Sequence, residues 1–556
     1  MLDFFTQCAR IYMNKALLIF YFSAVYVRRF FMKELSMLKI EDLTLEQKLG
    51  MLDALFLSPA YSDKEKEYAF DLIRRRSLGA IWIQQSTPGA FELVKKVREI
   101  ADYPILIITD AESGMCEYKI GNVNAIGCTG NESMAYAFGK ALAVTARSIG
   151  YSVVCSPVID SRKNGSPRQF GSNVREVARL GGAMARGMQD GGILTVAKHY
   201  PSGDNPKRID SHMAEGYSEQ TREQLLEEGL YPYRKLMEEG LLDGIMTGHH
   251  RFVNIDNTRP ASLSKPVIDI IRELGFDGFL ITDSLGMRGV SGRFGQAESN
   301  GLSIAAGNDL ALSCKPDMIF RHEAIISCYK QGMFDEARLN DAVRHVLNAQ
   351  AKAMREPKYT SLTNEEINMA KNIDLASIYA QCDKGITLPL SRDKRHLFAL
   401  MTRNENAIGI DGKVEVDTFS SSWQNTTAIT EKILESFPSS SVMAFHQFPN
   451  NVQICNILGS ASSYDDVVFI TFAEPIAYTG PEHLTRRAEC LINSAQSTGI
   501  VSALIHYGNP CVLEDLAHIP RVIIGGLSVR SNLGCIDVLA GDLEASGTLT
   551  YEAKIN

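Results

Sequence analysis

The chain has 556 residues, of which 45% are hydrophobic and 22% charged, and its formal net charge is −8 at pH 7. This composition is typical of a globular protein, and the length exceeds what one compact core organises, so we expect two domains, one of them large. The charge is modest, acidic and spread along the chain, which argues against nucleic acid as a partner.

The first segment, residues 1–36, differs from the rest of the chain. It contains the apolar run "ALLIFYFSAV", flanked by basic residues. The run is too short for a membrane-spanning helix and lacks a convincing cleavage site of small residues. We interpret residues 1–36 as an extension, either a membrane-associating segment or the product of a start codon misplaced upstream of Met32 or Met37.

The cysteines are eleven in number and widely scattered, and no two form a C-x-x-C pair. An odd number without local pairing fits neither a disulfide framework nor a zinc cluster. We therefore expect reduced thiols and a cytoplasmic location.

From about residue 79, short β-branched runs alternate with amphipathic stretches. The expected strands are 79–84, 104–110, 152–160, 193–199, 243–249, 278–283 and 302–312, and the helical stretches include 135–150, 174–192 and 221–240. Strands that alternate with helices form a parallel sheet, and roughly 250 residues of this alternation is the size of a (β/α)8 barrel. The fold prediction is α/β, with an N-terminal (β/α)8 TIM-type barrel over residues 37–355. Periodicity leaves an open doubly wound sheet as the alternative.

A break follows the last helical pattern of this region, where Pro357 lies in a polar run, so we assign residues 356–380 to a linker. Further strands are expected at 396–402, 441–446, 465–472, 500–508 and 521–526, with a helix over 486–499. These elements predict a smaller α/β sandwich domain over 381–556, with a mostly parallel sheet. Its sequence contains no recognised phosphate loop.

Polar side chains recur at the carboxyl ends of the predicted strands. They are Asp110, Asp160, Lys198, His199, His249, Asp283, Asn308 and Asp309. In a barrel these strand ends meet at the face that carries the active site. Each residue alone is more readily explained as a helix cap or a satisfied buried group, but their recurrence indicates a site.

Asp283 follows a run apolar enough to be a fully buried strand. A carboxylate there can attack an electrophilic carbon or stabilise positive charge, and a second group must then protonate the leaving atom. Asp210 and His212, in "KHYPSGDNPKRIDSH", place a carboxylate two residues before an imidazole, which it can orient. Asp-x-His alone is a weak motif, and the composition of this segment is also that of an ordinary solvated loop.

The same segment contains residue types that bind metals. They are His199, Asp204, Asp210 and His212. Helical zinc-binding spacing is absent, and Lys198 and Arg208 would place positive charge beside a cation. We expect no metal and no cofactor.

Five separated motifs together resemble glycoside hydrolase family 3, in particular its β-N-acetylglucosaminidase branch. They are "AKHYPSGD", "DSH", "SPVIDSRKNGSPRQFG", "GIMTGHHRFVNIDNTRPASLSKPVI" and "LGFDGFLITDSLGM". The resemblance extends from about Leu43 through the barrel, and more faintly through the second domain, at "CDKGITLPL" and "HYGNPCVLEDL".

The resemblance implies a retaining double displacement through a covalent glycosyl–enzyme intermediate. It makes Asp283 the nucleophile, and Asp210 and His212 the dyad that serves as acid/base on a flexible loop. For substrate binding, the resemblance and the strand ends together point to Asp110, Arg168, Lys198, His199 and His249. A neutral imidazole repels an incoming anion less than a carboxylate does, so transfer to phosphate is conceivable beside hydrolysis.

Two motifs depart from the family pattern. The usual D-Q-E-G-G-R reads D-A-E-S-G-M at residues 110–115, so an arginine expected near the glycan is missing. The usual P-G-H-G-D reads "PSGDNPKRI", which loses a histidine and changes the loop length. Both departures bear on the identity of the glycan.

We predict an exo-acting β-N-acetylglucosaminidase that removes terminal β-linked GlcNAc, with peptidoglycan fragments as one source. The expected partner is a small-molecule glycan, and neither a membrane nor nucleic acid is expected as a partner. A β-glucosidase-like specificity is one alternative, although it gives no reason for "DSH". A catalytically weakened glycan-binding or regulatory descendant is the other.

Overall fold

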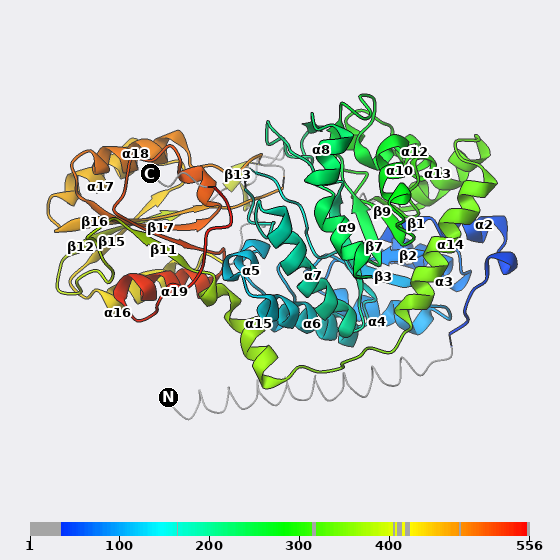
Figure 1. Ribbon diagram of the computed structural model, residues 1–556, viewed down its shortest axis with the longest axis horizontal. Coiled ribbons are helices and arrows are strands. Elements are labelled where there is room, and N and C mark those ends of the chain that lie inside the picture. The colour runs from blue at the N-terminus through cyan, green and yellow to red at the C-terminus, as the bar shows by residue number, and fades with distance from the viewer. Residues whose placement is uncertain are drawn as a thin grey trace.

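The computed structural model describes residues 35–163, 165–313, 318–403, 406–408, 414–416, 423–477 and 480–552. They form two α/β domains side by side (Figure 1). The predicted extension, residues 1–36, lies outside the described residues except for its last two. Within the described ranges, no helix combines the length and apolar character needed to cross a membrane.

The large domain is built on one eight-stranded parallel sheet. Its strands are β1 (Asp53–Phe56), β2 (Ala80–Trp82), β3 (Leu106–Thr109), β4 (Val153–Val154), β5 (Leu194–Tyr200), β7 (Gly244–Thr247), β9 (Phe279–Thr282) and β10 (Ala311–Ser313). The strand order is β10-β1-β2-β3-β4-β5-β7-β9, and a parallel bridge between Ile281 and Leu310 joins its two ends. The predicted barrel is confirmed. Its strands are buried on both faces, which explains their continuous apolar sequence.

Helices surround this barrel. They are α2 (Leu45–Gly50), α3 (Asp63–Arg74), α4 (Ala90–Ile100), α5 (Val123–Thr129), α6 (Glu132–Ile149), α7 (Val174–Asp190), α8 (Arg222–Glu227), α9 (Tyr231–Glu238), α10 (Lys265–Glu273), α11 (Arg288–Ser291), α12 (Gln296–Ala306), α13 (Met318–Lys330) and α14 (Glu336–Ala353). Local sequence sets their ends. For example, α6 begins after Asn131, whose side chain accepts hydrogen bonds from the first turn, and ends at Gly150 with a φ of 114°.

Three predictions for the barrel differ from the structure. The first strand, β1, was not predicted. The run over 302–312 is divided between the end of α12 and β10, which begins only at Ala311. The stretch over 221–240 forms two helices, α8 and α9, because the chain breaks at Glu228 and Pro232 lies in the first turn of α9.

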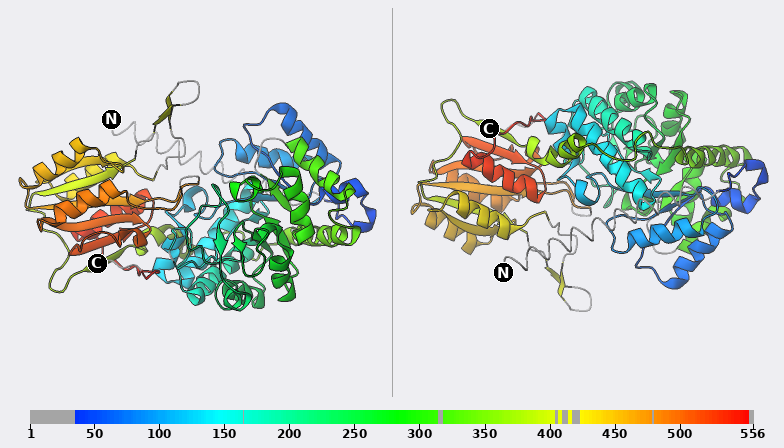
Figure 2. Two further views of the ribbon diagram at one scale, coloured as in Figure 1. Left: turned by 90° about the horizontal axis from the view of Figure 1, so that it is seen from above. Right: turned by 90° about the horizontal axis from the view of Figure 1, so that it is seen from below.

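The second domain has a six-stranded sheet. Its strands are β11 (Tyr379–Cys382), β12 (His396–Thr402), β15 (Ser441–His446), β16 (Asp466–Ala473), β17 (Val501–Gly508) and β18 (Arg521–Gly525). The order is β11-β18-β17-β16-β12-β15, and only β11, an edge strand, is antiparallel to its neighbour. Helices α16 (Thr426–Ser436) and α19 (Val529–Ala540) cover one face, and α17 (Asn451–Ala461) and α18 (Arg486–Gln496) the other (Figures 1 and 2). The predicted α/β sandwich is confirmed.

Smaller elements complete the described structure. The pairs β6 (Tyr217–Ser218) with β8 (Arg251–Phe252), and β13 (Asn406–Ile408) with β14 (Val414–Val416), form two-stranded sheets. The nine cysteines in the described ranges are free.

The two domains are joined by a helix and by the end of the described chain. Helix α15 (Asn364–Ala376) lies within the predicted linker and packs on α6. Its Asp374 accepts hydrogen bonds from the Gly121 amide of the barrel at 2.9 Å and from the Ser528 hydroxyl of the second domain at 2.7 Å. Near the end of the chain, the Tyr551 hydroxyl donates to the Ser166 carbonyl of the barrel at 2.5 Å. These contacts fix the second domain beside the carboxyl ends of the barrel strands.

Candidate active site

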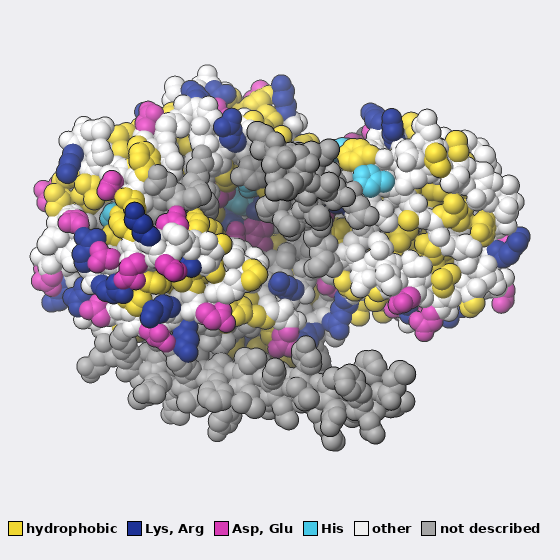
Figure 3. All heavy atoms as spheres, turned by 180° about the vertical axis from the view of Figure 1, so that it is seen from behind, with side chains coloured by type: hydrophobic (Ala, Val, Ile, Leu, Met, Phe, Trp, Pro, Cys, Tyr) yellow, Lys and Arg dark blue, Asp and Glu magenta, His cyan; other side chains and the backbone are white. Residues whose placement is uncertain are grey.

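A cavity of about 190 Å³ lies at the carboxyl ends of the barrel strands. The eight residues predicted to act in catalysis or substrate binding all line it: Asp110, Arg168, Lys198, His199, Asp210, His212, His249 and Asp283. Figure 3 shows acidic and histidine side chains recessed in a hollow of the large domain. Sites for drug-sized ligands measure roughly 300–1,000 Å³, so this cavity suits one smaller ring.

A buried lysine organises one wall of the cavity. Lys198, on β5, is 1% exposed, and its Nζ contacts Asp110 Oδ1 and, at 2.7 Å, Glu112 Oε1. The two carboxylates raise the pKa of Lys198 against the opposing effect of burial. Among the described residues, only Lys198 donates to the Asp110 carboxylate, at Oδ1, so Oδ2 remains as an acceptor for a ligand hydroxyl.

Glu112 is a site residue that sequence reasoning missed. Arg168 donates to both of its oxygens, at 2.9 Å from Nε and 2.6 Å from Nη2. Burial would raise the pKa of Glu112, but Arg168 and Lys198 lower it well below its usual range. The sequence feature that could have identified Glu112 is its position two residues after Asp110. Met115, which stands where the family has an arginine, is instead buried in the hydrophobic core.

His199 has a fixed orientation. Its backbone amide donates to Asp160 Oδ1 at 3.1 Å, and its Nδ1 lies 2.8 Å from Asp160 Oδ2. Burial would raise the pKa of Asp160, but His199 lowers it, so the carboxylate is ionised. It therefore accepts a hydrogen bond from the protonated Nδ1 of His199. Nε2 lies 3.4 Å from Arg168 Nη2 and accepts from it. His199 therefore presents a defined tautomer to the cavity.

Asp283 directly follows β9 and is partly exposed to the cavity. Its backbone amide donates to the Thr247 carbonyl at 2.9 Å, and its Oδ1 accepts from the Ser284 amide at 2.7 Å. Burial would raise the pKa of Asp283, but the side chains of His249, His199 and Lys198 lower it below its usual value. The carboxylate is therefore ionised at neutral pH.

His249 supports the backbone beside Asp283. It is 2% exposed, and burial lowers its pKa, so the ring is neutral. Its Nε2 donates to the Ser284 carbonyl at 3.0 Å, and its Nδ1 accepts from the Ser262 hydroxyl at 2.8 Å. Both ring nitrogens are thus engaged within the protein although the ring lines the cavity.

The segment "DSH" forms a compact turn. Asp210 Oδ1 accepts from the His212 backbone amide at 2.9 Å and lies 2.8 Å from His212 Nδ1. This contact places the Nδ1 proton toward the carboxylate, so Nε2 is the ring atom suited to exchange a proton with a ligand. The side chain of His212 is 29% exposed.

The turn is docked on the loop that follows Asp283. The Gly289 amide of α11 donates to the Ser211 carbonyl at 2.9 Å, and the Arg288 amide donates to the His212 carbonyl at 3.3 Å. A Cβ on residue 289 would lie 2.9 Å from the Ser211 oxygen, closer than such atoms normally approach. Glycine at this position lets the turn and Asp283 line the same cavity.

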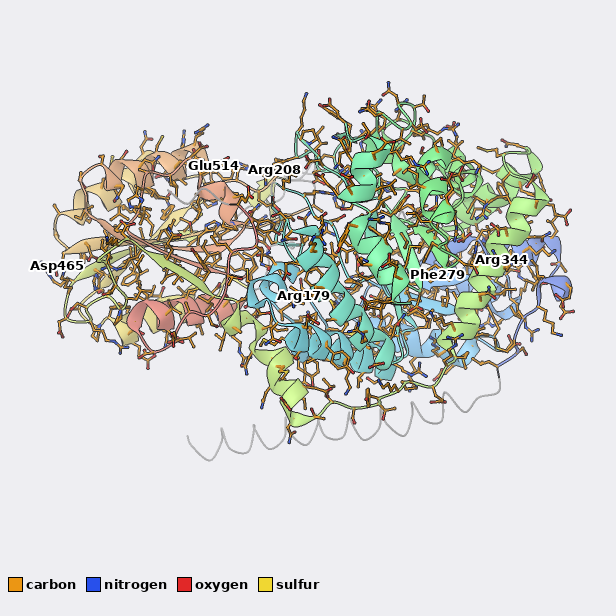
Figure 4. The ribbon with its side chains drawn as sticks, viewed as in Figure 1. Arg179, Arg208, Phe279, Arg344, Asp465 and Glu514 are labelled. Atoms are coloured by element: carbon orange, nitrogen blue, oxygen red, sulfur yellow. The ribbon has the colours of Figure 1, made fainter. Side chains whose placement is uncertain are left out.

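The altered loop before "DSH" reaches the second domain. Asn205 holds the loop by donating to the Ile209 carbonyl at 2.8 Å and accepting from the Ile209 amide at 3.1 Å. Arg208, at the domain boundary in Figure 4, donates to Glu482 Oε2 of the second domain at 2.8 Å. The segment that departs from the family pattern is therefore an interdomain contact.

The prediction for Asn308 and Asp309 was wrong. They precede β10, at the amino end of the strands, rather than following a strand. Asp309 is fully buried and accepts from Arg272, Arg338 and the amide of Leu280. The error follows from the strand boundary, because the apolar run that precedes these residues is the helix α12.

Comparisons with known proteins agree with this geometry. Residues 44–349, more than half of the chain, match the N-terminal domain of glycosyl hydrolase family 3. A β-hexosaminidase of Haemophilus influenzae is 29% identical over 279 residues, which are 47% of this chain and 75% of the relative. β-Hexosaminidase A of Pseudoalteromonas piscicida is 28% identical over 311 residues, which are 49% of this chain and 51% of the relative.

A solved structure shows the same fold in both domains. It is a family 3 β-N-acetylglucosaminidase from Paenibacillus, which superimposes with a TM-score of 0.76 at 23% identity and covers 92% of this chain and 100% of the other. The match of residues 44–349 and the barrel that carries the cavity lead to one conclusion: the chain belongs to glycosyl hydrolase family 3 and is a glycoside hydrolase.

Proposed function

We propose that this glycoside hydrolase is a retaining exo-β-N-acetylglucosaminidase that releases terminal β-linked GlcNAc. One observation carries the proposal: an ionised carboxylate, Asp283, and a carboxylate-bound imidazole, His212, line the same small cavity. The names of the β-hexosaminidase relatives support an N-acetylhexosamine as the sugar. Fragments of peptidoglycan are the source of substrate that we propose.

In the first half of the reaction, an oxygen of Asp283 attacks the anomeric carbon. His212, protonated on both nitrogens, gives its Nε2 proton to the glycosidic oxygen as the bond to the leaving group breaks. The leaving group departs as a neutral alcohol, and the sugar is bound as an ester of Asp283. Asp210 stabilises the charged ring beforehand through the 2.8 Å contact with Nδ1.

In the second half, the neutral ring of His212 takes a proton from water at Nε2. The water oxygen attacks the anomeric carbon, and the ester bond to Asp283 breaks with the electron pair returning to the carboxylate. Two displacements on one carbon give a product with retained β configuration. The surroundings of Asp283 favour its ionised form, which is needed both to attack and to leave.

Sugar hydroxyls bind, in this proposal, to Asp110, Lys198, Arg168 and His199. Glu112 holds Lys198 and Arg168 in place, so we assign it a positioning role. His249 was predicted to contact substrate. Its two internal hydrogen bonds support a role in positioning the backbone next to Asp283.

The test compares nitrophenyl β-N-acetylglucosaminide with the matching β-glucoside. We expect wild type to release nitrophenol from the first at least tenfold faster, and a 5-fluoro glycosyl fluoride of GlcNAc to label Asp283. Preference for the glucoside would overturn the specificity, and labelling of another carboxylate would overturn the nucleophile. Release of GlcNAc from purified muropeptides tests the source of substrate.

A further inference from the structure

A second cavity, of about 360 Å³, adjoins the first at the domain boundary. Asp210 and His212 line both cavities, whereas Asp283 lines only the smaller one. The far wall of the second cavity consists of residues 475–477 and 480–482 of the second domain. His212 therefore lies between a space that contains Asp283 and a space closed by the other domain.

This arrangement orients a bound glycoside, given the proposed function. The glycosidic oxygen must contact His212, and the sugar ring must lie on the side of Asp283, where the anomeric carbon is attacked. The leaving group then lies on the other side of His212. That side is the second cavity.

The second cavity is lined by three arginines with different partners, of which Arg162 and Arg168 also line the smaller cavity. Arg168 is bound to Glu112 at two points, and Arg208 is bound to Glu482. For Arg162, no acid or side-chain acceptor is found among the described residues, and its Nε is buried without a hydrogen-bond partner there. Asp160, two residues before it, contacts His199 with both carboxylate oxygens.

Arg162 therefore supplies a positive charge that the described protein does not neutralise by direct contact. The nearby His250 adds no second charge, because burial and Arg162 lower the pKa of His250 to about 3. A half-buried guanidinium facing a cavity is suited to a planar anion, which it binds by two parallel hydrogen bonds.

We propose that the second cavity is the leaving-group site and that Arg162 selects leaving groups that carry a carboxylate. The second domain takes part by closing this site. The ion pair between Arg208 and Glu482 holds the dyad loop against the second domain. Because Arg208 is bound to Glu482, it is not available to bind the ligand.

The experiment uses two β-N-acetylglucosaminides, of 4-(carboxymethyl)phenol and of its amide. The methylene group keeps the two phenols similar in leaving ability, and only one carries a charge. We expect wild type to have a kcat/KM about tenfold higher for the acid, as for a charge-assisted hydrogen bond. The preference should shrink as ionic strength rises.

In Arg162→Gln, the ratio of the two kcat/KM values should fall close to one, and Arg162→Lys should keep part of it. Each ratio is measured on one preparation, so a loss of folded enzyme cancels. Arg175→Gln is the control, because it removes the same charge from an exposed position on α7, and its ratio should equal that of wild type.

Three results would overturn the inference while leaving the proposed function in place. They are a wild-type ratio near one, an unchanged ratio in Arg162→Gln, and acceleration by inorganic phosphate with formation of a sugar phosphate that Arg162→Gln abolishes. The last result would mean that Arg162 binds the acceptor phosphate rather than the leaving group. Failure of wild type to cleave either substrate, or nitrophenyl β-N-acetylglucosaminide, would instead reject the proposed function.

Discussion

Two buried charge clusters lie at opposite ends of the barrel strands, and their acids differ in how fully they are bound. Asp309, at the amino end, accepts from Leu280, Arg272, Arg338 and His345 at 2.6–3.1 Å and is 0% exposed. Asp283, at the carboxyl end, accepts from the Ser284 amide alone among the described residues. A carboxylate whose acceptor sites are all occupied holds the fold together, whereas one with sites to spare can react.

The two carboxyls also have lowered pKa values for different reasons. Burial opposes ionisation in both. For Asp309 this effect of burial is outweighed by direct contacts with His345, Arg272 and Arg338. For Asp283 the effect of burial is offset by the nearby side chains of His249, His199 and Lys198, none of which is within hydrogen-bond distance of it in the described structure, and by the Ser284 amide. The active-site acid is thus kept ionised without giving up its oxygens.

The largest expected effect separates the two acids by activity. Asp283→Asn should lower kcat by about 10⁴-fold, because no other group can form the ester, as is typical when a nucleophile is removed. Its melting temperature should stay within a few degrees of wild type. Steady-state release of nitrophenol and a thermal melt measure both. Residual activity above a hundredth of wild type would remove Asp283 from the proposed role.

The second prediction separates them by stability. Asp309→Ala should lower the free energy of unfolding by about 3–5 kcal/mol, because it removes a fully buried carboxylate and leaves two partly buried arginines without their partner. Urea unfolding measures this loss. Activity per folded molecule should match wild type, since Asp309 does not line the cavity. Equal stability would mean that the cluster at the amino end does not hold the fold.

The third prediction concerns the proton. His212→Ala should slow cleavage of alkyl β-N-acetylglucosaminides by about 10²- to 10³-fold, because their alkoxide leaves poorly without an acid. The first step with a dinitrophenyl leaving group should suffer far less. Burst kinetics separate the two steps. If both substrates lost the same factor in that step, His212 would not be the acid.

A smaller effect is expected where the dyad turn docks. Gly289→Ala should lower kcat by about tenfold, because the new Cβ would push the Ser211 carbonyl and shift His212 relative to Asp283. Gly295→Ala, six residues further along the chain, is the control, since its Cβ would lie 3.9 Å from its nearest neighbours. Stopped-flow and melting measurements on both variants test whether docking, rather than stability, is changed.

The smallest effect is a pH dependence of stability. Because the pKa of Asp309 is lower in the folded protein than the usual value of about 3.9, its stabilisation is complete above that value and is lost as pH falls through the folded pKa. Between pH 6 and pH 3, the free energy of unfolding should therefore fall more steeply in wild type than in Asp309→Asn. Parallel curves would contradict the role of this carboxylate.

Much of the site could be predicted from the sequence because its residues follow apolar strands. Asp110, Lys198, His199 and Asp283 are polar residues at the ends of runs whose burial is unmistakable, and parallel strands bring such ends to one face. Asp309 shows the limit, because an apolar helix and an apolar strand differ little over a few residues.

The sequence alone determined the alternation of strands and helices, the two domains and the group of residues that line the cavity. Local propensity and hydrophobic period carry the alternation, the domains and the strand ends, whereas Arg168 was indicated only by the resemblance of its motif to the family. Only the tertiary structure decided that Glu112 holds Lys198 and Arg168, that Gly289 admits the dyad turn, and that the second domain closes the cavity beside His212. Those relations join residues far apart in the chain, so they depend on packing that no local pattern records.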